Sequence, residues 1–129
     1  MNDLVTFSRV LADTTRWRIV RLVLDDALCV CELADILNLP QSTVSSHVQI
    51  IRRAGLLKSE KCEKWTYFRI AARFRRLISH LEKFFPDAAS EWIEIDGPRS
   101  TKRLEERESS CCPRPKSFRT KRILTHLAK

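Results

Sequence analysis

The chain has 129 residues, a formal net charge of +8 and a hydrophobic content of 43%. This length favours one domain, and the hydrophobic content is sufficient for a packed core. The sequence contains no signal segment and no apolar run that is long enough to cross a bilayer, so we expect a cytoplasmic protein without a membrane partner. Five cysteines in a reducing compartment argue against a disulfide framework and favour buried thiols, metal ligands or redox chemistry.

The positive charge is concentrated towards the C-terminal end. Residues 1–98 contain 14 Lys and Arg against 13 Asp and Glu, a net charge of +1, whereas residues 99–129 contain 10 against 3, a net charge of +7. This contrast divides the chain into a folded domain, residues 1–98, and a basic, flexible tail, residues 99–129. Such a tail is expected to add non-specific affinity for nucleic acid.

The first half of the chain has the periodicity of helices. Apolar residues recur every three or four positions. The predicted helices cover residues 4–13, 14–26, 29–38 and 42–55. Asp13 or Thr14 is expected to cap the second helix and Ser42 the fourth, while Pro40 ends the third. The side chains predicted to face the core are Trp17, Val20, Val23, Leu24, Leu33, Ile36, Leu37, Val44, Val48 and Ile51.

The pattern then changes from a period of 3.6 to a period of 2. Residues 56–70 alternate around a polar turn near Cys62 and Glu63, which predicts a β-hairpin. A longer helix is predicted over residues 71–85, and its apolar face is larger than one small core needs. We expect this face to form the seam of a two-fold dimer. Its members are Phe74, Leu77, Ile78, Leu81, Phe84 and Phe85.

Two short helices joined by a turn and followed by a basic hairpin predict a winged helix-turn-helix, a mainly α fold with a small β-hairpin. On the helix at 42–55, the side opposite the apolar stripe is small and polar. Ser and Gln suit base edges in the major groove of double-stranded operator DNA, and Arg and Lys suit phosphates. The predicted DNA contacts are Gln41, Ser42, Thr43, Ser45, Ser46, Gln49, Arg52, Lys61 and Lys64. Solvated helices often have such faces, so the order of elements carries the prediction.

Four segments resemble the arsenic-repressor (ArsR/SmtB) family of bacterial metal-sensing repressors: "LADTTRWRIVRLVL", "LCVCELADIL", "STVSSHVQIIRRAGLL" and "KWTYFRI". The resemblance implies a dimeric winged helix that represses an operon and releases DNA when its effector binds. The stretch "LCVCEL" is similar to the thiol motif of the arsenic- and cadmium-responsive branch. Ala34 stands at the motif's third thiol position, and Glu63 stands where the family usually has a glycine at the wing turn.

The cysteines are the candidate effector ligands, because thiolates are soft ligands that select thiophilic ions. Residues two apart in a regular helix point about 200° apart, so Cys29 and Cys31 share one ion only if the first turn unwinds or Cys29 precedes the helix. Trivalent arsenic or antimony prefers three thiolates, and Cys111 or Cys112 is expected to supply the third. Methylated arsenite needs two. Cys62 is interpreted as a packing residue.

Other interpretations of the thiols remain open at the level of sequence. A redox switch or a cadmium- or lead-sensing repressor fits the same scaffold. Cys29 and Cys31 also suit small buried positions, and Cys111 and Cys112 suit an incidental place in a tail. An enzyme is not expected, because no glycine follows Cys112 to cradle an oxyanion.

Overall fold

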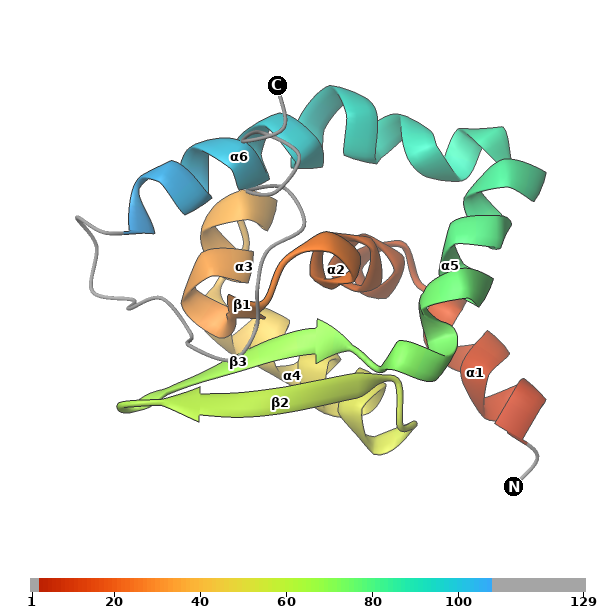
Figure 1. The fold of residues 1–129 in the computed structure, drawn as a ribbon, viewed down its shortest axis with the longest axis horizontal. Helices are drawn as coiled ribbons and strands as arrows, with labels where there is room; N and C mark the ends of the chain where they lie inside the picture. Colours follow the sequence, from red (N-terminus) through yellow and green to blue (C-terminus); the bar gives the residue numbers. More distant parts are fainter. Residues whose placement is uncertain (1–2, 108–129) are drawn as a thin grey trace.

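The computed structural model describes residues 3–107, and Figure 1 shows their fold. It is mainly helical with one small antiparallel sheet, as the sequence predicts. The helices are α1 (Asp3–Leu11), α2 (Thr14–Asp25), α3 (Val30–Leu37), α4 (Gln41–Arg53), α5 (Ala72–Phe84) and α6 (Gly97–Glu105). A 3₁₀ turn, η1 (Pro86–Ala89), and a short π-helix, η2 (Trp92–Asp96), connect α5 to α6. The strands are β1 (Leu28–Cys29), β2 (Leu57–Cys62) and β3 (Trp65–Ile70).

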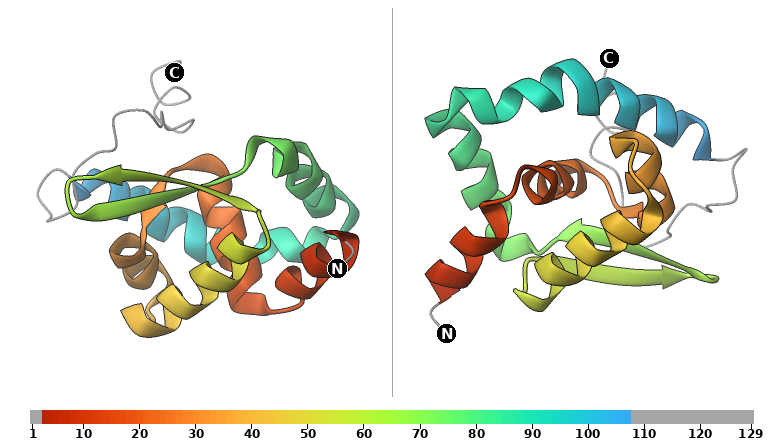
Figure 2. Two further views of the ribbon diagram at one scale, coloured as in Figure 1. Left: turned by 90° about the horizontal axis from the view of Figure 1, so that it is seen from below. Right: turned by 180° about the vertical axis from the view of Figure 1, so that it is seen from behind.

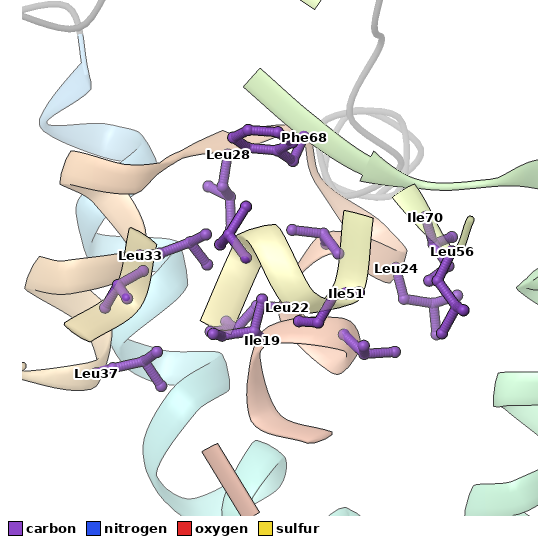
Figure 3. Close-up of a cluster of buried hydrophobic side chains, with 14 of the residues drawn as sticks. Ile19, Leu22, Leu24, Leu28, Leu33, Leu37, Ile51, Leu56, Phe68 and Ile70 are labelled. Atoms are coloured by element: carbon purple, nitrogen blue, oxygen red, sulfur yellow. The ribbon is translucent and has the colours of Figure 1, made fainter. Parts of the chain in front are cut away.

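Helix α2 lies at the centre of the domain, with α3 on one side and α5 on the other (Figure 1). Asp13 is its N-cap residue and accepts a hydrogen bond from the backbone N–H of Arg16 at 2.9 Å, so the predicted cap is confirmed. Ile19 and Leu22 of α2 are fully buried, although the sequence stripe did not include them. Figure 3 shows how α2, α3, α4 and the sheet contribute to one core. The core is therefore wider around α2 than one amphipathic stripe indicates.

Helices α3 and α4 are joined by a tight turn and pack against each other. Asn38 ends α3 in the left-handed conformation, with φ 56°, which Asn tolerates better than most residues. Pro40 is the N-cap residue of α4, and the helix begins at Gln41. The prediction that Ser42 caps this helix is therefore wrong by two residues, because Pro40, with its fixed φ, already supplies the extended residue before the helix.

The sheet has three strands in the order β1-β3-β2, all antiparallel. The hairpin of β2 and β3 confirms the predicted wing, and its register pairs Cys62 with Trp65. Strand β1 was not predicted: Cys29 pairs with Tyr67 of β3, and α3 begins only at Val30. The prediction that the third helix begins at Cys29 is therefore wrong by one residue. Pairing with a strand almost forty positions later overrides the local helical pattern here.

Residues after α5 form a strap, defined here as residues 86–107, which crosses over α2 and ends beside α3 (Figures 1 and 2). The predicted boundary at residue 98 falls inside α6, so the structure differs from the expected flexible tail over residues 99–107. Helix α6 is poor in apolar residues and is held through side chains of distant elements, which periodicity does not reveal. The remainder of the predicted tail lies outside the described residues.

Polar contacts attach the strap to α2. Arg18 donates to both carboxylate oxygens of Asp96, at 2.8 and 3.0 Å, and this hydrogen bonding raises the pKa of the arginine. Trp17 Nε1 donates to the carbonyl of Ala88 at 3.0 Å. The Arg21 guanidinium lies 4.0 Å from the centre of the Trp92 ring. These contacts give the polar side of α2 a partner and extend the domain beyond a minimal winged helix.

The predicted apolar face of α5 divides into two parts. Ile78 is fully buried, and Phe74 and Leu81 pack against the core. Leu77, Phe84 and Phe85 are exposed, by 43%, 76% and 62% of their surfaces. Helix α1 contributes exposed Leu4 and Val5, and a stacked ring pair, Phe7 and Phe74, joins α1 to α5. An apolar surface therefore remains uncovered on α1 and α5 of the single chain.

Candidate DNA-reading surface and thiol site

Helix α4 presents the predicted polar face to solvent. Val44, Val48 and Ile51 are fully buried, so the apolar stripe is confirmed. On the other faces, the side chains that are exposed are Gln41, Ser42, Thr43, Ser46 and Arg52, and those that are half-buried are Ser45 and Gln49. The Ser46 hydroxyl donates to the Ser42 carbonyl at 3.0 Å within the helix. The predicted contact residues of α4 thus share one accessible surface next to a basic last turn.

The wing tip carries two lysines on either side of Glu63. Lys61 and Lys64 are both exposed, and the Lys64 ammonium lies 4.9 Å from the centre of the Trp65 ring. Glu63 has φ 58°, the left-handed region that favours glycine. The chain therefore adopts, with a strained Glu, the turn for which the family resemblance predicts a glycine. The lysine side chains are presented at the tip of the β2–β3 hairpin.

Cys29 occupies the junction between β1 and α3. It is the N-cap residue of α3, with φ −92° and ψ 170°, so it precedes the helix rather than lying within its first turn. Its backbone N–H donates to Glu32 Oε1 at 3.2 Å as part of a capping box. The Cys29 side chain is buried. Because Cys29 precedes the helix, the backbone allows Cys29 and Cys31 to share one ion. The buried sulfur of Cys29 is, however, not accessible to that ion.

Three free cysteines gather around one small cluster, formed by the buried residues Ala27, Cys29 and Tyr67. Cys31 and Cys62 pack against this cluster and are half-buried. Within residues 3–107, no three His, Cys, Asp or Glu side chains are grouped closely enough to hold a metal ion. Cys111 and Cys112 lie outside the described residues. A three-thiolate site consequently needs a ligand from outside the described chain or a rearrangement of these thiols.

Glu32, one residue after Cys31, is a fully buried carboxylate that sequence reasoning missed. Arg107 Nε donates to Glu32 Oε2 at 2.7 Å, and Arg107 Nη2 donates to Oε1 at 2.9 Å. Arg103 adds a 2.8 Å bond to Asp35, and Arg99 donates to the Ile36 carbonyl at 3.2 Å. The sequence does contain a pattern that indicates these contacts. The three arginines are spaced four residues apart and would therefore share one face of a helix.

Comparison with known proteins places this arrangement in a family. Residues 13–59, from the cap of α2 into β2, match the profile described as bacterial regulatory protein, arsR family. The chain is 35% identical over 92 residues to arsenic resistance transcriptional regulator ArsR1 of Pseudomonas putida, covering 70% of this chain and 72% of the relative. The chain belongs to the ArsR family. The resemblance stated from the sequence is thereby confirmed.

A further relative and a solved structure are also similar to this chain. The cadmium resistance regulatory protein CadC of Listeria innocua is 37% identical over 63 residues, which cover 48% of this chain and 53% of that protein. The homodimeric winged helix-turn-helix domain Mb0332 of Mycobacterium bovis superposes with a TM-score of 0.61 at 22% identity, covering 71% of this chain and 82% of that domain. The winged helix-turn-helix fold is therefore confirmed.

Membership of the ArsR family makes this chain a DNA-binding transcriptional repressor rather than an enzyme. Among residues 3–107, no helix combines the length and the apolar character that crossing a bilayer requires. The names of the relatives include both arsenic and cadmium regulators, so family membership alone leaves the effector open.

Proposed function

We propose that this ArsR-family repressor binds operator DNA as a homodimer and releases it when arsenite or antimonite binds to Cys29, Cys31 and one tail thiol. The observation that carries the proposal is the place of Cys29 at the N-cap of α3, the helix that packs directly against α4. The arsenic resistance regulator ArsR1, which shares 35% identity, supports an arsenical effector. A trivalent arsenical supplies a thiophilic centre that thiolates bind.

The buried position of Cys29 supports a competition between effector and DNA. Its sulfur has to leave the core before it can join Cys31 at one centre, and this movement opens the capping box with Glu32. Leu33, Ile36 and Leu37 of α3 share the core with Val44 and Val48 of α4. A disturbed first turn of α3 therefore disturbs the helix that presents the reading surface.

Arg107, the last residue that the structure describes, is held beside this site. Its guanidinium donates hydrogen bonds to the Glu32 carboxylate and to the carbonyl of Ala27. Cys111 follows four residues later, and four residues of extended chain span at most about 14 Å. This reach is compatible with a third ligand from the same protomer.

Under reductant, arsenite is expected to release operator DNA from the wild-type protein but not from Cys29→Ser/Cys31→Ser. Coupling of about 1–3 kcal/mol corresponds to roughly 5–150-fold weaker DNA binding. Fluorescence anisotropy of labelled operator during arsenite titration measures the release. Cys62→Ser, which alters a thiol of the same cluster, is the matched control and should respond normally. Normal release by the double variant would contradict the assigned site.

Cadmium is the competing effector, because a cadmium regulator is among the relatives. A panel of arsenite, antimonite, methylated arsenite, cadmium and lead in the same assay separates the two. Cys111→Ser/Cys112→Ser should weaken the response to arsenite more than the response to methylated arsenite, which needs two thiolates. Release that occurs only under oxidising conditions would instead favour a redox switch.

Substitutions on α4 and on the wing are expected to have different effects on DNA binding. Ser46→Ala and Gln49→Ala should change the preferred operator sequence, since these side chains suit base edges. Lys61→Ala and Lys64→Ala should weaken binding to all sequences and reduce the salt slope by about one unit each. Selection from a randomised duplex library, with titration at several salt concentrations, measures both properties. Altered base preference in the lysine variants alone would reverse the two roles.

A further inference from the structure

We propose that Arg107 is a positioning residue for the thiol site: it holds the buried Glu32 carboxylate and, through it, keeps Cys29 in its buried place before α3. The C-terminal strap thereby controls how readily the Cys29 thiol becomes accessible. The consequence for thiol reactivity stands on the contacts alone. The consequence for effector binding rests on the proposed function.

One carboxylate oxygen connects the arginine to the thiol-bearing residue. Glu32 Oε1 accepts from Arg107 Nη2 at 2.9 Å and from the backbone N–H of Cys29 at 3.2 Å. The other oxygen accepts from Arg107 Nε at 2.7 Å. This is the two-pronged geometry that arginine forms with a carboxylate, and it fixes the orientation of the carboxylate as well as its charge. The N-cap backbone of Cys29 is therefore oriented by a residue 78 positions later.

Arg107 also contacts two other neighbours of Cys29. Its Nη2 donates to the carbonyl of Ala27 at 2.8 Å, directly before β1. Its guanidinium lies 5.5 Å from the centre of the Tyr67 ring, and Tyr67 is the β3 partner of Cys29. Ala27, Cys29 and Tyr67 are the three buried members of the thiol cluster. The Arg107 side chain thus contacts Tyr67 on the strand beside Cys29, Ala27 before Cys29 and Glu32 after it.

A contribution to stability alone is a poor explanation for the buried ion pair between Glu32 and Arg107. Replacing a buried ion pair by apolar groups of similar volume is often neutral or stabilising, so the pair is weak evidence for a role in stability. A pair that holds one conformation, and is lost in another, suits a two-state element better. Movement of the Cys29 sulfur out of the cluster breaks the capping box, and this weakens the hold of Glu32 on Arg107. By linkage, loss of the Arg107 contact should favour exposure of the thiol to the same extent.

The test is the rate at which iodoacetamide modifies Cys29 in the folded full-length protein, under a non-thiol reductant. Arg107→Met alone leaves the buried Glu32 carboxylate with only the Arg103 guanidinium, 4.0 Å away, as its counter-charge. The main variant is therefore Glu32→Gln/Arg107→Met, in which Gln keeps an acceptor for the Cys29 N–H. Mass spectrometry of peptides gives the rate at Cys29 relative to Cys62 in the same sample. Arg99→Gln is the matched control, because it removes an α6–α3 bond at the opposite end of α3.

The ratio of the Cys29 rate to the Cys62 rate is expected to increase about tenfold or more in the double variant, which corresponds to about 1.4 kcal/mol. It should stay at the wild-type value in Arg99→Gln. Arg107→Lys keeps the charge without the fork and should give an intermediate ratio. Unchanged modification rates in the double variant would overturn the proposal. Equal increases in the rates at Cys29 and Cys62 would also overturn it, because they would indicate a general loss of protection in the domain.

An arsenite titration without DNA separates this proposal from the proposed function. If both hold, the double variant binds arsenite more tightly than the wild type, by a factor similar to its gain in Cys29 reactivity. If Cys29 becomes more reactive while neither protein binds arsenite, the positioning role of Arg107 stands and the arsenical effector is refuted. If arsenite binds equally to both proteins and Cys29 reactivity is unchanged, Arg107 has no positioning role and the proposed function stands.

Discussion

Truncation after Pro98 is expected to destabilise the domain by about 3–5 kcal/mol, the usual cost of leaving one member of a buried ion pair without its partner. The truncated chain loses Arg103 and Arg107, the two arginines that pair with Glu32, a carboxylate that is fully buried in the intact chain. It also loses the contacts of α6 with Asp35 and with the carbonyl of Ile36. Urea denaturation followed by circular dichroism measures the change in the free energy of unfolding.

Truncation after Arg107 is the matched control for this prediction. It keeps every contact described for the strap and removes residues 108–129, which contain six Lys and Arg against one Glu, a net charge of +5. This shorter truncation should preserve stability and operator preference while reducing the salt dependence of DNA binding. Equal denaturation midpoints for the two truncated chains would show that α6 is dispensable.

Much of the reading helix could be predicted because its local and tertiary requirements agree. Val44, Val48 and Ile51 recur at helical spacing, and all three are fully buried. The alternation of residues 56–70 likewise predicted both wing strands, whose register is set by a short polar turn. At these places the sequence pattern and the packing of the domain demand the same conformation, so the pattern alone was sufficient.

The surroundings of Cys29 could not be predicted because they depend on distant partners. Strand β1 has two residues and exists through its pairing with Phe68 and Tyr67. Helix α6 lacks an apolar stripe, and its attachment to α3 comes from arginines that meet Glu32, Asp35 and a backbone carbonyl. Composition alone made this segment look like a solvated tail. The thiol positions were found from spacing and resemblance, but their burial and the role of Arg107 needed the three-dimensional arrangement.

The exposed part of α5 leads to the second prediction of large effect. Leu77 and Phe84 are exposed and lie seven residues apart on one face of α5, and the Phe7–Phe74 ring pair joins this helix to α1, which carries exposed Leu4 and Val5. Exposed apolar patches of this kind mark interaction sites, and a two-fold axis pairs such a patch with its own copy. Leu81 packs against the core, so a charge there would perturb folding as well. Leu77 and Phe84 therefore give a cleaner test of the dimer seam than Leu81 does.

Leu77→Glu/Phe84→Glu is expected to yield a folded monomer, because four glutamates would face one another across the seam of each dimer. Loss of the second reading helix removes bivalent binding to inverted half-sites, and affinity for the full operator should fall roughly 10²–10⁴-fold. Analytical ultracentrifugation gives the oligomeric state, and anisotropy with a full site and a half-site gives both affinities. Ala72→Glu/Ser79→Glu has the same seven-residue spacing at exposed positions of α5 and should stay dimeric. Half-site affinity should change little, since α4 is untouched. A Leu77→Glu/Phe84→Glu protein that remains a dimer would place the seam on another surface.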